Sequence, residues 1–348
     1  MYVLTATQDD VSMSQNSISS AGSNISQHFV SLNKGTTATR KAEQCIEDKS
    51  GDLSRQDFVF QRNQDLLSNL MQEIHLGKIN KQQVLYKLTG KKVYPIKHES
   101  DTCTCSIYSA CVIADGSVIL ADNNNKKLKR LDASSYKVDD VCDLPNYPWQ
   151  VCSVEKHDVA ISWYVKDIQL VSVEGKMKKT RILKTDHNCY GIGYRNGKLY
   201  ITDSDTTVFV YNMKGTMLKQ FSKDQSGKPL FTDILSLAVS DNGKKIYISD
   251  HTYGLVVLDQ DEMLLRKYNC LRLKEACEVC EIDDRNVLVC GILSNNIIKF
   301  APYGEVAEEV LPSDEGIGGC RAICFDCRHR KVIVGHISRD EIEIYDVV

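Results

Sequence analysis

CVIADGSVILADNNNKKLKRLD, residues 111–132, is the stretch from which the fold of the chain can be inferred. It begins with a short apolar segment, turns at Asp115 and Gly116, and continues with a second apolar segment up to Asp122. After a polar gap, a third segment ends at Leu131 and Asp132. Short segments separated by Gly, Asp and Asn are typical of antiparallel strands. Three such strands do not bury a core by themselves, so they must pack against another part of the chain.

The same pattern recurs from about residue 92 to the C-terminus. Its six copies are ADGSVILAD, KHDVAISW, RNGKLYITD, DNGKKIYISD, DDRNVLVCG and CRHRKVIVGH, which end at Asp122, Trp163, Asp203, Asp250, Gly291 and His336. Each copy is followed by a further β-type segment, and the spacing of roughly 40–47 residues is that of propeller blades. A small sheet that is apolar on both faces is shielded from water only between neighbours. The sequence therefore predicts an all-β fold, a six-bladed β-propeller.

The predicted ring comprises residues 91–348. Its last copy ends with a third strand, EIEIYDVV, so the fourth strand of that blade must come from elsewhere. We expect KKVYPIKHES, residues 91–100, to pair beside the C-terminal strand, because closing the ring removes an exposed sheet edge.

Two segments precede the predicted ring. Residues 1–55 are rich in Ser, Asn, Gln and Thr and poor in aliphatic residues, which predicts a disordered leader. Residues 56–90 carry apolar residues at helical spacing and are expected to form a short helical segment. The apolar positions are Leu66, Leu67, Leu70, Met71 and Ile74.

Composition excludes several classes of protein. The 348 residues include 43 Lys and Arg against 46 Asp and Glu, and a net charge of −3 gives no general attraction to nucleic acid or anionic membranes. No apolar run approaches the roughly 18 residues that a membrane span needs, so no membrane partner is expected. The N-terminal MYVLTATQDD lacks the cationic start of an export signal. The 14 cysteines are therefore expected to be reduced thiols of a cytoplasmic protein.

The cysteines suggest two interpretations. CEVC (residues 277–280) and CRAICFDC (residues 320–327) have spacings that also occur in zinc sites. Aligning the repeats favours compact structural thiols, because one inner-strand position near the crowded axis recurs in every copy. Its predicted occupants are Cys111, Cys152, Ile192, Ala238, Cys280 and Cys324. On this interpretation the chain holds no metal and no cofactor.

The predicted axis is also relevant to catalysis. Metal-dependent lactonases and esterases with this fold need several oxygen ligands that converge on the axis. The inner strands are predicted to begin at Ser109, Gln150, Tyr190, Ser236, Glu278 and Ala322. This set contains one carboxylate and no His, so we assign no catalytic residue and expect no enzyme activity. A metal-dependent hydrolase is kept as the second alternative.

Binding residues are predicted on the face whose loops lead into the inner strands. These loops carry large side chains of the types that anchor protein interfaces. The candidates are Tyr147, Trp149, His187, Tyr190 and Arg321. We expect this face to bind a protein partner.

Two basic clusters suggest RNA binding as the first alternative, because Lys and Arg can contact phosphates. KKLKR contributes Lys126, Lys127, Lys129 and Arg130, and KMKKTRILK contributes Lys176, Lys178 and Lys179. The same residues could also form a solvated rim that protects outer strands from edge pairing.

Several stretches resemble a known family. CVIADGSVILADNNNKKLKRLD, CDLPNYPWQVC, TDHNCYGIGYRNGKLYITD, VSDNGKKIYISD and KVIVGH are similar to the C-terminal NHL-type propeller of tripartite-motif proteins, above all those of molluscs and other marine invertebrates. FVFQRNQDLLSNLMQEIHLGKI resembles the stretch that follows their coiled coil, so the resemblance covers about residues 56–348.

The resemblance implies the substrate-recognition propeller of a ubiquitin ligase. Such ligases begin with a RING finger, B-boxes and a coiled coil, and their propeller selects the partner. Before Cys103 this sequence has only Cys45, so the RING and B-box are not present and ubiquitin transfer by this chain alone is not expected. Related NHL propellers bind either protein or RNA, so both partners remain open, as does the oligomeric state.

Overall fold

The computed structural model describes residues 87–348, with gaps at 204, 284–285, 302–306 and 314–317. The predicted leader and most of the predicted helical segment lie outside the described residues. All the described residues belong to one compact unit. In that part of the chain there is no helix of the length and apolar character needed to cross a membrane.

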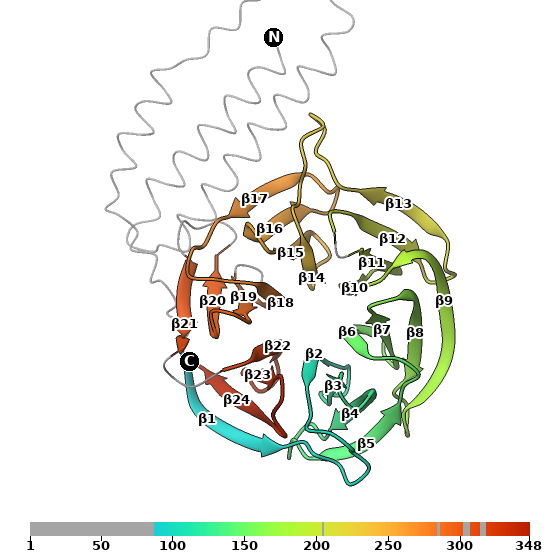
Figure 1. Ribbon diagram of the computed structural model, residues 1–348, viewed down its shortest axis with the longest axis vertical. Coiled ribbons are helices and arrows are strands. Elements are labelled where there is room, and N and C mark those ends of the chain that lie inside the picture. Colours follow the sequence, from blue (N-terminus) through green and yellow to red (C-terminus); the bar gives the residue numbers. More distant parts are fainter. Residues whose placement is uncertain (1–86, 204, 284–285, 302–306, 314–317) are drawn as a thin grey trace, which may run out of the picture. The chain divides into compact units, whose positions relative to one another are not determined.

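Twenty-four strands form six four-stranded antiparallel sheets that are arranged around a central axis (Figure 1). The inner strands are β2 (Ile107–Val112), β6 (Pro148–Val154), β10 (Ile192–Arg195), β14 (Ile234–Val239), β18 (Ala276–Asp283) and β22 (Cys320–Asp326). The second strands are β3 (Val118–Asp122), β7 (Asp158–Trp163), β11 (Lys198–Thr202), β15 (Lys245–Asp250), β19 (Asn286–Gly291) and β23 (Lys331–His336). The third strands are β4 (Lys127–Leu131), β8 (Lys166–Ser172), β12 (Val208–Asn212), β16 (Gly254–Asp259), β20 (Asn296–Phe300) and β24 (Glu341–Val347). The outer strands are β1 (Leu88–Pro95), β5 (Val138–Asp143), β9 (Lys178–Asn188), β13 (Met217–Phe221), β17 (Leu264–Tyr268) and β21 (Ala307–Leu311). The predicted six-bladed β-propeller is therefore confirmed.

The ring is closed by strand β1. It pairs antiparallel with β24 from Leu88 opposite Val347 to Pro95 opposite Glu341, which is where the sequence analysis expected this segment. The strand begins three residues before the expected boundary, so residues 88–90 belong to the ring and not to a helix. A bulge follows at Gly90, whose backbone has a φ of +64° that favours glycine.

The core lies between neighbouring blades. In β3, Val118 and Leu120 pack against blade 6 (β22, β23, β24 and β1), whereas Ile119 and Ala121 pack against blade 2 (β6 to β9). Successive side chains of a strand point to opposite faces, so one short apolar run supplies two interfaces. Six such clusters of buried residues join the blades around the ring.

Compact residues line the axis, where the inner strands surround a hollow of about 450 Å³. The residues at the aligned position are Cys111, Cys152, Gly193, Ala238, Cys280 and Cys324. Gly193 replaces the predicted Ile192, because Gly193 pairs with Tyr200 as Cys111 pairs with Ile119. A Cβ at Gly193 would approach Leu237 Cδ1 to 2.6 Å, so this position in blade 3 (β10 to β13) accommodates only glycine without a shift.

Candidate functional site

The two faces of the ring follow from the alternation of its strands. Loops that lead into the inner strands lie on the same side as loops that join second and third strands; we call this side the entry face. Loops that join first to second strands, and third to outer strands, lie on the opposite side, the exit face.

At the centre of the entry face, each blade contributes one residue that lies three positions before its compact axial residue. These residues are Tyr108, Trp149, Tyr190, Leu235, Cys277 and Arg321. All except Tyr190 line one small hollow, and Tyr190 packs edge-on against Trp149. The repeat therefore places four large aromatic or cationic side chains at the mouth of the axis.

Trp149 is the centre of an aromatic group on this face. Its ring centroid lies 5.3 Å from that of Tyr108, 5.0 Å from Tyr190 and 5.8 Å from Tyr164, in edge-on or tilted geometry. The guanidinium carbon of Arg321 lies over two of these rings, 4.9 Å from Tyr108 and 4.7 Å from Trp149. Such ring and cation–π contacts are favourable and hold the side chains in place. We call these five residues the entry cluster.

The structure brings together three of the five residues that the sequence analysis proposed for partner binding: Trp149, Tyr190 and Arg321. Tyr147 lies apart, with 53% of its surface exposed and the Nζ of Lys126 4.3 Å from its ring centroid.

His187 does not join the entry cluster. Its ring is stacked on Phe209 with 3.6 Å between centroids, and its nitrogens are hydrogen-bonded to the carbonyl of Asn188 and the hydroxyl of Tyr211. Burial lowers the pKa of His187, which favours the neutral ring. Its role in this structure is packing between blades.

Sequence reasoning missed two members of the cluster, Tyr108 and Tyr164. Tyr108 had a usable signal, because it precedes Ser109 in blade 1 (β2 to β5) as Trp149 precedes Gln150 in blade 2. Tyr164 follows the end of β7 in a loop and has no equivalent in the repeat pattern.

A belt of polar side chains lies beneath the entry cluster and connects the blades. Gln150 donates from Nε2 to the carbonyl of Leu237 at 3.2 Å and accepts from the amide of Ile192 at 2.8 Å. Glu278 bonds the hydroxyl of Ser109 and accepts from the amide of Ile323 at 2.8 Å. These bonds fix the strands that carry the cluster.

Glu278 is the one carboxylate that the sequence analysis placed at the inner-strand starts. Burial raises its pKa to about 8, although the hydrogen bonds and the nearby charge of Arg321 act in the opposite direction. The side chain is therefore mostly neutral at pH 7, and both of its oxygens are engaged within the belt.

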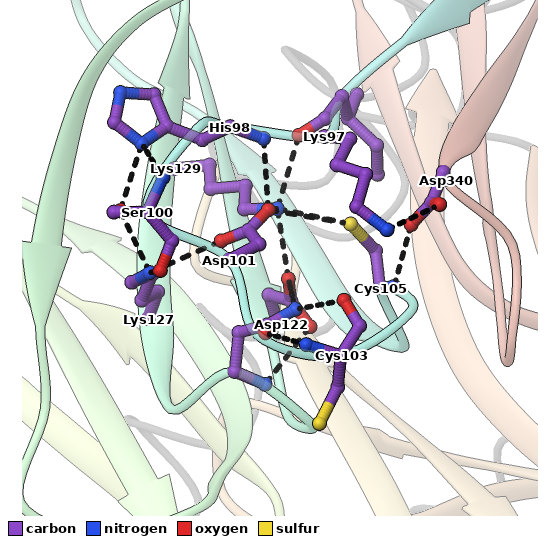
Figure 2. Close-up of polar contacts among 12 residues, drawn as sticks. Lys97, His98, Ser100, Asp101, Cys103, Cys105, Asp122, Lys127, Lys129 and Asp340 are labelled. Carbon is purple, nitrogen blue, oxygen red and sulfur yellow. Dashed lines mark hydrogen bonds and ion pairs between the residues drawn. The ribbon is translucent and has the colours of Figure 1, made fainter.

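The first basic cluster is not a surface patch, which corrects the sequence analysis. Figure 2 shows Lys127 and Lys129 directed into a network with residues of the loop between β1 and β2. Lys129 is fully buried, and its Nζ lies 2.5 Å from Asp101, 2.8 Å from Asp122 and 3.0 Å from the sulfur of Cys105. The side chains of Asp101, Cys105 and Asp122 lie close enough to one another to hold a metal ion, but the Lys129 ammonium lies between them and supplies the positive charge.

The other basic candidates differ in exposure. Arg130 is paired with Asp139 at 2.9 Å and donates to the carbonyl of Gly175 at 2.5 Å. Lys176, Lys178 and Lys179 are exposed at the exit end of blade 2. Only this second cluster forms a surface group that a phosphate backbone could reach.

Neither zinc-like spacing brings its own thiols together, although one thiol of each, Cys277 and Cys320, interacts with Cys290. Cys277 is buried with its sulfur 3.0 Å from that of Cys290, whereas Cys280 faces the axial hollow and Cys327 is exposed in a turn. Burial raises the pKa of Cys277, Cys280, Cys290 and Cys324, so these thiols are neutral.

Comparison with known proteins supports the fold. No family model matches the sequence, and no curated protein matches it. Among solved structures, the WD40 repeats of RRP9 align with a TM-score of 0.56 at 11% identity, over 75% of this chain and 100% of that one. A streptogramin B lyase aligns with 0.54 at 12% identity, over 74% and 98%. The propeller of Cps50 (Swd1) from Myceliophteria thermophila aligns with 0.52 at 11% identity, over 70% and 84%. At these identities the likeness shows a shared β-propeller fold alone.

Proposed function

We propose that this chain is a non-catalytic recognition module that binds a protein partner on its entry face. Its role would be that of the substrate-selecting propeller of the tripartite-motif ubiquitin ligases that its repeats resemble. Trp, Tyr and Arg are the residues that most often anchor protein interfaces, and the entry cluster consists of these types. The thirteen cysteines among the described residues are free thiols, which suits a cytoplasmic location.

The observation that carries this proposal is the uneven distribution of exposed apolar side chains. Entry-face loops expose five large ones: Tyr147, Tyr164, Val165, Leu271 and Leu293. On the exit side, the described residues outside the strands include two, Met263 at 38% and the C-terminal Val348 at 63%. The side of a protein that exposes more apolar side chains is the better candidate for an interaction surface. The side of the ring that carries the entry cluster is therefore the side suited to docking.

The experiment uses the intact tagged chain to capture cytosolic proteins after RNase treatment, with quantitative mass spectrometry. Tyr164→Ala with Leu293→Ala removes two exposed side chains from the entry face, 57% and 64% exposed. Met217→Ala with Leu218→Ala is the matched control, because both are 49% exposed on outer strand β13. We expect the entry variant to reduce capture about tenfold or more and the control to leave it unchanged. Equal capture by both variants would contradict the proposal.

RNA binding is the second candidate, and one observation favours it. Lys176, Lys178 and Lys179 are exposed beside one another and form no ion pair with the described residues. If they bind RNA, capture is lost on RNase treatment and on changing all three to Ala. The affinity then falls with salt with a slope of about −0.7 per neutralised phosphate. Because these three lysines lie on the exit side, RNA binding would use the exit face, whereas protein binding would use the entry face.

A further inference from the structure

The guanidinium of Arg321 is unusual among the charged groups of this chain. It comes from the second residue of β22 and points to the centre of the entry face, where 7% of the residue is exposed. Tyr108 and Trp149 lie beside it and fix its position through their ring faces. A guanidinium held in this way is pre-organised, so little conformational freedom is lost when it binds a ligand.

This guanidinium lacks a polar partner. The described part of the chain offers it neither a hydrogen-bond acceptor nor an ion-pair carboxylate, and its Nε is buried without a bond. Other buried cations of the ring, such as Lys129, are surrounded by acceptors. Buried polar groups are almost always hydrogen-bonded, so an open guanidinium indicates a bond that a ligand completes.

A second unsatisfied atom lies in the same hollow. The hydroxyl oxygen of Ser236 is buried without a hydrogen bond, and Ser236 lines the hollow together with Arg321, Tyr108 and Trp149. The hollow measures about 10 Å³, which is room for one group of the size of a water or an oxygen atom. A donor hydroxyl and a guanidinium around an oxygen-sized space match an anionic oxygen.

The carboxyl that lines the same hollow does not neutralise Arg321. Glu278 lines the same hollow but is engaged with Ser109 and the amide of Ile323. Because burial raises its pKa to about 8, it is mostly uncharged at neutral pH. The positive charge of Arg321 therefore remains available at the mouth.

We propose that Arg321 is the anchor for a carboxylate, and that the partner docked on the entry face inserts an Asp or Glu side chain there. The carboxylate pairs with the guanidinium and directs one oxygen toward the hydroxyl of Ser236, while Trp149 and Tyr164 contact the flanking residues. This inference rests on the proposed function, because it specifies the chemistry of the partner at the same face.

An acidic protein segment fits better than a nucleic acid. Carboxylates match the planar fork of Arg, and the surrounding rings favour apolar neighbours. A phosphate backbone needs several cations along its path. Of the basic residues that the sequence analysis grouped, Lys126 lies in an entry-face loop with its Nζ over the ring of Tyr147, Lys127 and Lys129 are buried, and the exposed group of three lysines lies on the exit side.

The test pans the intact chain against a phage library of short random peptides. Selected peptides are synthesised with a C-terminal amide, so that the carboxylate that binds Arg321 cannot be the one at the peptide terminus. Their affinities are measured by fluorescence polarisation. Each acidic residue of a peptide is changed to its amide, and the chain is tested as wild type and as Arg321→Met. Arg272→Met is the matched control, because Arg272 lies in an entry-face loop with 54% of its side chain exposed.

We expect selected peptides to share an acidic residue whose change to the amide weakens binding about tenfold or more in the wild type and Arg272→Met. In Arg321→Met the same change should have no effect, because the two groups form one pair. The melting temperature of Arg321→Met should change little, because the loss of the cation–π contacts with Tyr108 and Trp149 is opposed by the removal of a buried charge that has no internal acceptor. A lower melting temperature with unchanged peptide preference would show a purely structural role and overturn the inference.

Failure of the inference is distinguishable from failure of the proposed function. Peptides that lose affinity with Tyr164→Ala but show no dependence on Arg321 or on an acidic residue would overturn the carboxylate site and leave the docking face in place. Peptides that are all indifferent to Tyr164→Ala would contradict the docking face itself. A single-stranded RNA oligonucleotide whose binding depends on Arg321, in the absence of acidic peptide binders, would replace the proposed partner by RNA.

Discussion

Replacing Lys129 by Ala should strongly destabilise the ring. The Nζ of Lys129 is fully buried and bridges Asp101 at 2.5 Å and Asp122 at 2.8 Å, and both carboxylates also have side chains with 0% exposure. The substitution leaves the buried carboxylate of Asp122 without a cation among the described residues, and leaves Asp101 with only Lys127, whose Nζ is 3.1 Å away. Removing one partner of a buried pair costs about 3–5 kcal/mol, a large part of the roughly 5–15 kcal/mol that stabilises a typical domain.

Urea unfolding followed by tryptophan fluorescence measures this loss, with the midpoint and slope of each variant compared. The matched control is Lys184→Ala, which removes the same side chain from an ion pair with Asp167 at 2.7 Å. Because 79% of the Lys184 side chain is exposed, this pair should contribute less than about 1 kcal/mol. A loss for Lys129→Ala no larger than that of the control would refute the reasoning.

Two further measurements separate the charge effect from a general packing defect. Lys129→Met combined with Asp101→Asn and Asp122→Asn removes the unpaired charges and should recover part of the lost stability. In the wild type, burial alone would raise the pKa of Asp101, but the hydrogen bond from Lys129 lowers it below the ordinary 3.8. The stability that this pair supplies is therefore complete above pH 3.8 and is lost as the pH falls further, where the difference between Lys129→Ala and wild type should shrink.

Three other predictions follow from the ring. Burial raises the pKa of Glu278 from 4.5 to about 8, so ionisation of this side chain in the folded protein costs stability as the pH rises. In urea unfolding, the stability of Glu278→Gln relative to wild type should therefore increase by up to about 3 kcal/mol between pH 6 and pH 9. An equal difference in stability between the two proteins at both pH values would contradict this. Deleting the chain up to Pro95 removes β1 and exposes the edge of β24. Light scattering should then show association of the truncated chains, and an added peptide of residues 88–95 should suppress it. A truncated chain that stays monomeric and unfolds like the wild type would speak against closure of the ring by this strand. Iodoacetamide followed by mass spectrometry should label the exposed Cys103 and Cys327 before the buried Cys277, and early labelling of Cys277 would show that the inner strands open readily.

The repeat could be recognised because every blade buries both faces. The five residues of β3, from Val118 to Asp122, are all buried, and equivalent apolar runs recur at each blade. The closing strand was also predictable, since the last blade ended one strand short. The alignment failed at Gly193 because the hairpin of blade 3 has only two residues, Asn196 and Gly197, between its paired ends.

The candidate site was only partly predictable, because its contacts depend on the closure of the ring. Lys129 is buried by Asp101, which reaches it from the loop after β1, and nothing in the local sequence KKLKR distinguishes it from a surface lysine. Arg321 meets Tyr108 and Trp149 only because blades 6, 1 and 2 converge on one axis. Residue type indicated which side chains could anchor a partner, whereas the ring decides which of them lie together.

Site-specific photo-crosslinking gives the most direct test of docking on the entry face. A benzophenone amino acid is placed in the intact chain at Tyr164, on the entry face of blade 2, or at Lys156, exposed on the exit face of the same blade. We expect irradiation in cytosol to attach a protein to the chain through position 164 and nothing through position 156. Adducts formed only from position 156, or adducts that consist of RNA, would contradict the account.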